Sequence, residues 1–268
     1  MIKLVVIDLD GTLLNPEHTI SQISIHTLQQ LYQQGIEIML ATGRHYQDVY
    51  LLAQQLQIPS CLITSNGARV HNEQAKLVYE NHIPEYLVHQ ILSLSSGYEV
   101  HRNLYQQDLW LVEEPNEPLL NIHHSSGFEY QITNFDDIDC QHIDKFYFNA
   151  PHQKLKPLQQ QLMKKLADQL YITFTTENYL EVMNKGVSKG QALEKVLIQK
   201  NIKASDVMAF GDGLNDVDML KLVGYPIIMQ NAHPDLKAQL PSAAQTKSNA
   251  EDGVAYYLQT HLLKSFQS

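Results

Sequence analysis

The chain of 268 residues is poor in cysteine, in basic residues and in long apolar runs. Its two cysteines, Cys61 and Cys140, lie far apart without Cys-x-x-Cys or Cys/His spacing, so we expect two ordinary thiols and neither thiol nor zinc chemistry. The 13 histidines likewise show no spaced Cys/His or HExxH pattern, and we do not expect them to bind a metal. The 19 basic residues are scattered and the net charge is -10, which argues against a nucleic-acid partner.

No apolar run approaches the roughly 18 residues that a membrane helix needs. Asp8 interrupts the apolar stretch near the N-terminus, so the layout of a signal peptide is also missing. We therefore expect a cytoplasmic protein with no membrane partner.

The composition that remains is that of a compact globular protein, because 44% of the residues are hydrophobic and 18% are charged. The length fits one large α/β domain or a core with a smaller inserted domain. We expect a monomer or a weak homodimer.

A strand–helix alternation opens the chain. Leu4 to Ile7 predict a strand buried on both faces, and Ser21 is a plausible N-cap of the helix that follows. Two further strands end in "ATGR" and in "TSNG". The order strand, helix, strand, helix, strand indicates a parallel sheet with right-handed crossovers. The first helix is expected to bury one face, formed by Ile25, Leu28, Leu31 and Tyr32.

The pattern changes between about residues 84 and 184. Short alternating pieces surround one amphipathic helix with Leu155, Leu158, Leu162 and Leu166, and strand–helix alternation then resumes. We predict an α/β fold: a doubly wound, mostly parallel, Rossmann-like core with an inserted α+β cap. The core would comprise residues 1–83 and 185–268, and the cap residues 84–184.

Polar residues follow three of the predicted core strands, at the sheet edge where open parallel sheets bind ligands. Lys189 begins the helix that leads into the last of these strands. We expect all of these side chains to converge. The three loops contribute Asp8 and Asp10; Thr42, Gly43 and Arg44; and Asp212, Gly213, Asn215 and Asp216.

Carboxylates crowded at one sheet edge repel one another unless a cation joins them, and an all-oxygen set suits Mg²⁺. Lys189, Thr42 and the glycine turns suit an anion, and phosphate is the natural candidate. No Ser, Cys or His is placed as a nucleophile by its spacing, so either a metal-bound water or an aspartate attacks. Asp10 is close enough in sequence to Asp8 for one carboxyl of the pair to hold a proton and act as an acid for the leaving alcohol.

These motifs resemble those of the haloacid dehalogenase superfamily of phosphatases. "DLDGTLL", "ATGR", "SKG" and "GDGLND" are similar to its four motifs, and the length of the middle segment resembles the Cof-type subfamily with its larger cap. The resemblance implies an aspartyl-phosphate intermediate and a Mg²⁺ cofactor. It implies the following roles: Asp8 as nucleophile and metal ligand, Asp10 as acid/base and main-chain metal ligand, Asp212 as a further metal ligand, and Leu9 (by its backbone), Thr42, Gly43, Lys189 and Asn215 as the phosphate site.

Four more residues match or adjoin this pattern less firmly. Asp216 matches a family position that supports the metal indirectly, and Arg44 and Asn66 match positions near the substrate. Glu181 lies just before the chain returns to the predicted core, where a role at the substrate rim and a solvated strand carboxylate are both open.

The function expected from all four motifs is Mg²⁺-dependent hydrolysis of small phosphomonoesters. "ATGRHYQDV", "ITSNGARVH" and "LEVMNKGVSKGQALE" look like a Cof-type enzyme that acts on pyridoxal phosphate and sugar phosphates. Two alternatives stay open: a phosphomutase, and a non-catalytic protein that binds a phosphorylated metabolite.

Overall fold

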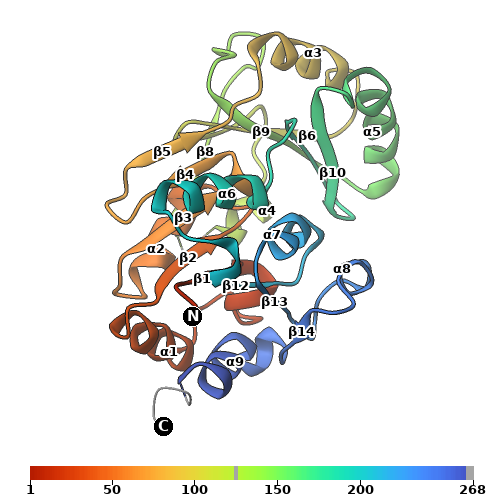
Figure 1. Ribbon diagram of the computed structural model, residues 1–268. Coiled ribbons are helices and arrows are strands. Elements are labelled where there is room, and N and C mark those ends of the chain that lie inside the picture. The colour runs from red at the N-terminus through yellow and green to blue at the C-terminus, as the bar shows by residue number, and fades with distance from the viewer. Residues whose placement is uncertain (124–125, 264–268) are drawn as a thin grey trace. The chain divides into compact units, whose positions relative to one another are not determined.

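The structure is a computed structural model, and it describes residues 1–123 and 126–263. The chain forms two compact units. Unit 1 comprises residues 1–44, 49–79 and 188–268, and unit 2 comprises residues 45–48 and 80–187. Each unit has its own sheet, and each is described below by itself (Figure 1).

The sheet of unit 1 has the strand order β14-β13-β12-β1-β2-β3-β4-β5. The central strands are parallel, with Val6 paired to Met39 on one side and to Ala209 on the other, whereas β4 runs antiparallel to β3. This confirms the predicted, mostly parallel sheet. Its strands are β1 (Leu4–Ile7), β2 (Glu37–Ala41), β3 (Ser60–Thr64), β4 (Arg69–His71), β5 (Leu77–Glu80), β12 (Val207–Gly211), β13 (Tyr225–Ile228) and β14 (Ala244–Gln245).

The first helix of unit 1 begins where the sequence predicts, because the hydroxyl of Ser21 accepts a hydrogen bond from the Ser24 N–H at 3.1 Å. Ile25, Leu28 and Leu31 are buried as expected, but Tyr32 is 38% exposed. Tyr32 lies at the margin of the apolar stripe, where a phenol keeps its hydroxyl in water. That first helix is α1 (Gln22–Gln33), and the other helices with residues in this unit are α2 (Tyr46–Gln54), α6 (Lys189–Lys200), α7 (Val217–Leu222), α8 (Pro234–Gln239) and α9 (Gly253–His261).

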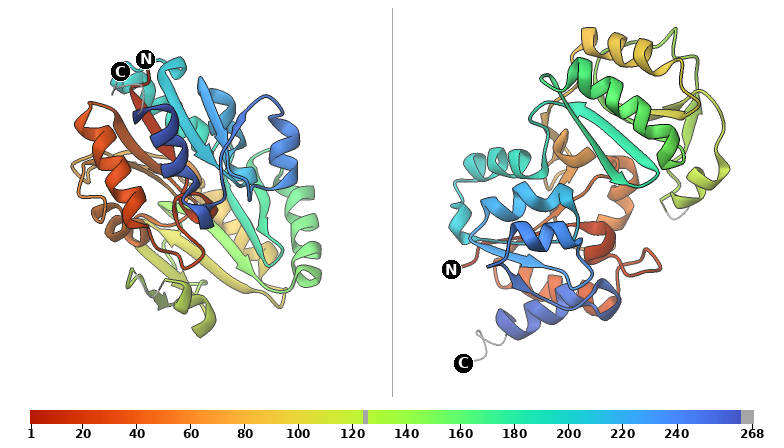
Figure 2. Two further views of the ribbon diagram at one scale, coloured as in Figure 1. Left: turned by 90° about the horizontal axis from the view of Figure 1, so that it is seen from below. Right: turned by 90° about the vertical axis from the view of Figure 1, so that its right-hand side faces the viewer.

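Two helix pairs accompany this sheet. α1 lies beside α9, and α6 lies beside α7, so segments far apart in the chain are neighbours (Figures 1 and 2). β1, in the middle of the sheet, is buried along its whole length, with all four residues at 0–1% exposure. β1 is buried on both faces, and its carboxyl end lies at the sheet edge that carries the motifs.

Unit 2 is built on a second sheet, with the order β10-β11-β9-β6-β7-β8. Its neighbouring strands are antiparallel except for β7 and β8, which are parallel. The strands are β6 (His101–Gln106), β7 (Leu109–Val112), β8 (Tyr130–Ile132), β9 (Ile143–Asn149), β10 (Leu170–Thr176) and β11 (Tyr179–Asn184).

The two faces of this sheet carry different side chains. Helices α3 (Glu85–Ser95) and α5 (His152–Leu166) lie side by side and pack on one face, against Phe146 and Phe148 (Figure 2). All four predicted leucines of α5 are buried there, at 0–1% exposure. The other face carries an aromatic cluster that includes Trp110 and also Leu119 from α4 (Glu117–Ile122). Alternation along the strands therefore gives unit 2 an aliphatic face and an aromatic face.

None of the helices in the described part of the chain is both long enough and apolar enough to cross a membrane.

Candidate active site

An ion-pair cluster in unit 1 joins the first, third and fourth motifs. Asp8 follows β1, and its Oδ1 lies 2.5 Å from Nζ of Lys189, which is the first residue of α6. The same ammonium lies 2.7 Å from Oδ1 of Asp216. Lys189 and Asp216 are fully buried, and Asp8 is 5% exposed. The lysine therefore binds two carboxylates from opposite ends of the chain.

Asp216 also fixes the loop after β12. Its Oδ2 accepts hydrogen bonds from the N–H groups of Asp212 and Gly213, at 3.0 and 2.9 Å. With Oδ1 bound to Lys189, both of its oxygens have protein partners. Asp216 thus connects Lys189 to the backbone of the loop that carries Asp212.

Asp212 lies next to Asp8 in space. Oxygen atoms of Asp8, Asp212 and Asp216 lie within 4.8 Å of one another, so the predicted convergence of the first and fourth motifs is present. The hydroxyl of Thr12 donates to Oδ1 of Asp212 at 2.8 Å. Our sequence interpretation gave Thr12 no role, although it is the last residue of the D-x-D-G-T motif and could have been found there.

The crowding of these carboxylates changes their proton affinity. Burial and the charge of Asp216 raise the pKa of Asp8 well above its ordinary value of 3.8, although Lys189 opposes the shift. The same two causes raise the pKa of Asp212 to about 6. Burial by itself would lower the pKa of Lys189, but Asp216 and Asp8 raise it overall. Two carboxylates at this sheet edge are therefore destabilised in their charged form, as expected for groups that await a cation.

A glycine turn brings the first motif against Asp212. Gly11 has φ +76°, and a Cβ there would lie 2.3 Å from Oδ2 of Asp212. A residue with a side chain would be both strained and in collision. The turn Leu9–Leu13 is closed by the N–H of Leu13, which donates to the carbonyl of Asp8, and by that of Leu14, which donates to Leu9. Leu9 is fully buried.

The second motif is held by hydrogen bonds to the neighbouring loop. The N–H of Asn66 donates to the carbonyl of Thr42 at 3.0 Å, and Nδ2 of Asn215 donates to Oδ1 of Asn66 at 2.9 Å. A Cβ on Gly43 would lie 3.0 Å from the same amide oxygen. Thr42 and Gly43 are thereby connected through Asn66 to Asn215 of the fourth motif.

Asp10 has different surroundings from Asp8. Its two carboxylate oxygens accept hydrogen bonds from Nε and Nη2 of Arg44 at 2.7 and 2.6 Å, and its side chain is 45% exposed. The carboxylates that crowd one another are those of Asp8, Asp212 and Asp216, so the proton-sharing partner that the sequence suggested for Asp8 is paired with an arginine instead. The turn at Gly11 and the guanidinium together separate the two motif aspartates.

Glu181 lies on β11 in unit 2. Its Oε1 is 2.8 Å from Nζ of Lys145, and that ammonium lies over the rings of Tyr105 and Tyr147, 5.0 and 5.5 Å from their centroids. Glu181 is 8% exposed. A buried ion pair on the aromatic face replaces the solvated strand carboxylate that was one of the two expectations.

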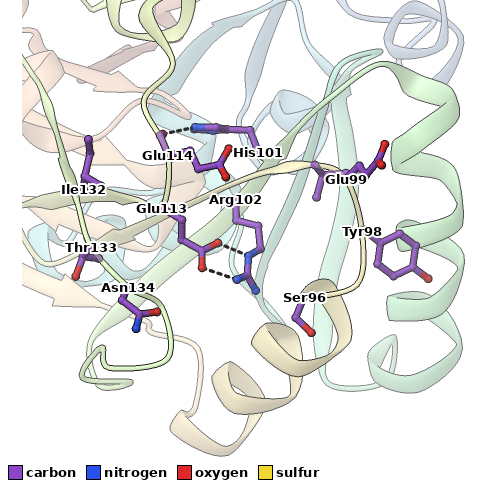
Figure 3. A pocket seen from close by; sticks show the side chains of 11 residues that line it. Ser96, Tyr98, Glu99, His101, Arg102, Glu113, Glu114, Ile132, Thr133 and Asn134 are labelled. Atoms are coloured by element: carbon purple, nitrogen blue, oxygen red, sulfur yellow. Dashed lines mark hydrogen bonds and ion pairs between the residues drawn. The ribbon is translucent and has the colours of Figure 1, made fainter.

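Unit 2 also has a cavity of about 910 Å³. Arg102 and Glu113 lie at its wall and form a bidentate pair (Figure 3), with both N···O distances at 2.5 Å. None of the motif residues lines it. The guanidinium also lies over the ring of Phe135, so it stabilises unit 2 and is not available to an anionic ligand.

Comparisons with known proteins identify the family. The sequence profile of the haloacid dehalogenase-like hydrolase family matches residues 5–258. An HMP-PP phosphatase of Yersinia pseudotuberculosis serotype O:1b (strain IP 31758) is 36% identical over 265 residues, which are 99% of this chain and 97% of the relative.

Solved structures show the same fold. A haloacid dehalogenase-like hydrolase from Bacteroides thetaiotaomicron is 27% identical, with a TM-score of 0.87 over 97% of this chain and 99% of that chain. A subclass IIB sugar phosphatase of the superfamily is 23% identical, with a TM-score of 0.82 over 96% and 98%, and supports the fold alone. The profile match and the full-length relatives leave one assignment: the chain belongs to the haloacid dehalogenase-like hydrolase family and is one of its phosphatases.

Proposed function

We propose that this protein is a Mg²⁺-dependent phosphatase that hydrolyses small phosphomonoesters through an aspartyl-phosphate on Asp8. The observation that carries the proposal is the position of Asp8: a buried carboxylate at the end of β1, bound to a buried lysine and close to Asp212. A nucleophilic carboxylate needs positive charge beside it to approach a phosphate dianion, and Lys189 supplies part of that charge.

The residues present fit a magnesium ion. Asp8 and Asp212 offer carboxylate oxygens close together, and burial together with the charge of Asp216 raises the pKa of both, which a bound cation would offset. These two side chains and the main chain of Asp10 would hold the ion, while Asp216, whose oxygens already have partners, would support the loop. Bound there, Mg²⁺ supplies charge that screens the phosphoryl group from the attacking carboxylate.

In the proposed reaction a carboxylate oxygen of Asp8 forms a bond to phosphorus, and the bond from phosphorus to the ester oxygen breaks. Asp10 gives a proton to the departing alkoxide. Asp10 then takes a proton from the water that attacks the aspartyl-phosphate, which releases inorganic phosphate and restores Asp8. Lys189, Thr42, Gly43, Asn215 and the backbone of Leu9 would bind the phosphoryl oxygens, and Arg44 orients Asp10 through the two hydrogen bonds described above.

The proposed substrates are the phosphomonoesters pyridoxal phosphate and hexose phosphates. The name of the Yersinia relative adds HMP-PP, a diphosphate, from which the same attack would remove the terminal phosphoryl group with a phosphate oxygen as the leaving group. We assign substrate choice to unit 2 because its aromatic face combines tyrosine rings with the Lys145–Glu181 pair. Aromatic rings stack on a heterocycle, and the ion pair supplies a donor and an acceptor.

The test is release of inorganic phosphate from a panel of these compounds, with and without Mg²⁺, by the wild type and by Asp8→Asn. We expect turnover only with the metal, and a fall in kcat of about 10⁴-fold or more in Asp8→Asn. Asp235→Asn is the matched control, because that side chain is 74% exposed and lies outside the cluster.

Two outcomes would refute the proposal. Substantial Mg²⁺-dependent turnover by Asp8→Asn would remove the nucleophile. Conversion of a sugar phosphate to its isomer without phosphate release would show a phosphomutase.

A further inference from the structure

A second group of metal-ligating side chains lies in unit 2, at the point where two distant segments meet. The N–H of Ile83 donates to the carbonyl of Ile143 at 2.8 Å, in an isolated antiparallel bridge, and both isoleucines are buried. The bridge places the segment with Glu80 and His82 beside the segment with His142 and Asp144.

A register shift in the pairing of β9 turns the side chain of Asp144 toward the segment that contains His82. In the pairing of β9 with β6, Tyr105 is opposite Lys145 but Gln106 is opposite Ile143, so Asp144 is the extra residue. Such a bulge turns a side chain away from the regular alternation of the strand. Its carboxylate, fully buried, reaches Nδ1 of His82 at 2.9 Å.

This contact fixes the orientation of the His82 ring. A carboxylate only accepts, so Nδ1 carries the hydrogen and donates it, which leaves the lone pair of the neutral ring on Nε2. Nε2 faces the carboxylate of Glu80, whose Oε2 lies 3.1 Å away. The His142 ring meets the His82 ring edge-on, with centroids 5.1 Å apart.

One ligand atom from each of Glu80, His82 and His142 lies within 4.8 Å of the others. Zinc–nitrogen and zinc–oxygen bonds of about 2.0–2.2 Å place neighbouring ligand atoms roughly 3.4 Å apart. Glu80 and His142 are exposed and can close the difference by side-chain rotation, while His82 is held by Asp144.

We propose that Glu80, His82 and His142 bind a divalent transition-metal ion, best matched by Zn²⁺, and that Asp144 orients His82 for this purpose. Two imidazoles and one carboxylate leave a fourth position to water, and a carboxylate behind a histidine ligand is the usual supporting arrangement in such sites. Imidazole ligands select Zn²⁺ and its neighbours over Mg²⁺.

The local charge supports a cation at this point. The carboxylates of Asp144 and Glu80 lie 2.9 and 3.1 Å from the two ring nitrogens of His82. The negative charge of these two carboxylates favours a divalent ion beside the ring. Sequence spacing conceals the site, because position 142 reaches positions 80 and 82 only through the bridge at Ile83.

The experiment uses the full-length protein, stripped of metal and then supplied with excess Mg²⁺ to fill the carboxylate cluster of unit 1. Co²⁺, a spectroscopic substitute for Zn²⁺, is titrated in and followed by its visible absorption, and Zn²⁺ is then measured by competition. We expect one equivalent of Co²⁺ to bind with nitrogen-ligand absorption, and Zn²⁺ to displace it. Asp212→Asn should keep this signal, because the two groups of ligands share no residue.

Variants separate the roles of the four residues. Glu80→Gln and His142→Asn should each abolish the signal; Asn is chosen at 142 because φ there is +57°, which Asn tolerates. Asp144→Asn should weaken binding by about 10- to 100-fold. His26→Ala, an exposed histidine on α1, is the matched control and should bind as the wild type does.

Melting curves in EDTA establish that the variants are folded. In separate melts without EDTA, Zn²⁺ should raise the Tm of the wild type but not that of His142→Asn. The proposal is overturned if the wild type shows no Co²⁺ absorption, if the Glu80→Gln/His142→Asn double variant binds with unchanged affinity, or if Asp212→Asn removes the signal.

Discussion

At the scale of single residues, Asp8 and Asp10 are two positions apart but have different environments. Asp8 is buried between Lys189 and other carboxylates, whereas Asp10 is half-exposed and paired with Arg44. A buried carboxylate held against a lysine suits attack on phosphorus. A partly exposed one at an arginine has access to solvent and suits the exchange of a proton with the leaving group and with water.

Asp10→Asn should therefore affect substrates unequally. With a poor leaving group such as a sugar alkoxide, we expect kcat to fall by about 10²–10⁴-fold, the usual contribution of a general acid. With p-nitrophenyl phosphate, whose leaving group departs without a proton, the loss in formation of the aspartyl-phosphate should be much smaller. Single-turnover kinetics on the two substrates measure this step. Equal losses on both would show that Asp10 positions groups and does not transfer the proton.

Asp212 makes the stability of the metal-free protein depend on pH. Its pKa rises from 3.8 to about 6 on folding, so between these values the folded state holds more protons than the unfolded state. Stability from this group is therefore greatest at low pH and falls as the pH rises toward 6, by up to about 3 kcal/mol. In thermal melts in EDTA, the Tm at pH 5 minus the Tm at pH 7 should be larger for the wild type than for Asp212→Asn.

Magnesium should reverse that trend, because the ion binds the charged form. The rise in Tm on adding Mg²⁺ is expected to be larger at pH 7 than at pH 5, and to be small in Asp212→Asn. An equal rise at both pH values would mean that Asp212 is not a ligand.

At the scale of elements, the loops of the site depend on close backbone approaches. Gly67 has φ +101°, and a Cβ there would lie 2.3 Å from the carbonyl oxygen of Ser188, the N-cap of α6. The loop after β3 and the third motif thus meet at a point that only glycine fits, and Lys189 is the residue after Ser188.

Gly67→Ala should lower the free energy of unfolding by more than the strain of a positive φ does, because the added Cβ also collides with Ser188. Gly35 provides the matched control, since its φ is +85° but no atom lies within 4 Å of an added Cβ. We expect Gly35→Ala to cost about 1–2 kcal/mol and Gly67→Ala a further 1–3 kcal/mol, measured by urea unfolding. Loss of phosphatase activity should accompany only Gly67→Ala. Similar costs for the two variants would show that the 67–188 contact relaxes freely.

Many of the helices and strands could be predicted from the sequence. The run Leu4–Ile7, the cap at Ser21 and the four leucines of α5 follow from apolar periodicity and local capping, and the structure confirms them. Side-chain direction could not be predicted in the same way. Whether Asp10 faces the carboxylates or Arg44 depends on the turn at Gly11, which no periodicity encodes.

Contacts between segments distant in the chain could not be predicted from the sequence either. The meeting of His82 with His142 depends on one bridge between segments 60 residues apart and on a bulge at Asp144. The Lys145–Glu181 pair similarly depends on the register of β9 against β11. Neither arrangement leaves a local pattern.

At the scale of the whole molecule, each of the two units packs its own hydrophobic side chains against its own sheet. We propose that residues 84–184 act as the substrate-specificity domain. Residues 79–80 and 187–188 mark the two main chain crossings between the units. Two crossings let one unit unfold locally while the other keeps its hydrogen bonds.

Phe146→Ala should test this separation. Phe146 is fully buried between β9 and the helices of unit 2, and its truncation should cost about 3–5 kcal/mol. Hydrogen-exchange mass spectrometry is expected to show lost protection in peptides from residues 80–187 only. Phe210→Ala, equally buried on β12, is the control and should expose peptides of unit 1. Lost protection throughout the chain in both variants would show a single cooperative unit.

The dipeptide Asn66–Gly67 bears on how this enzyme ages. In a flexible chain, an asparagine before glycine loses its amide when the next backbone nitrogen attacks the side chain. Here Asn66 is 3% exposed, its N–H is bound to Thr42, and its amide oxygen accepts from Asn215. The folded site therefore protects its own most labile bond, and chemical damage there will accumulate at the rate at which the loop opens.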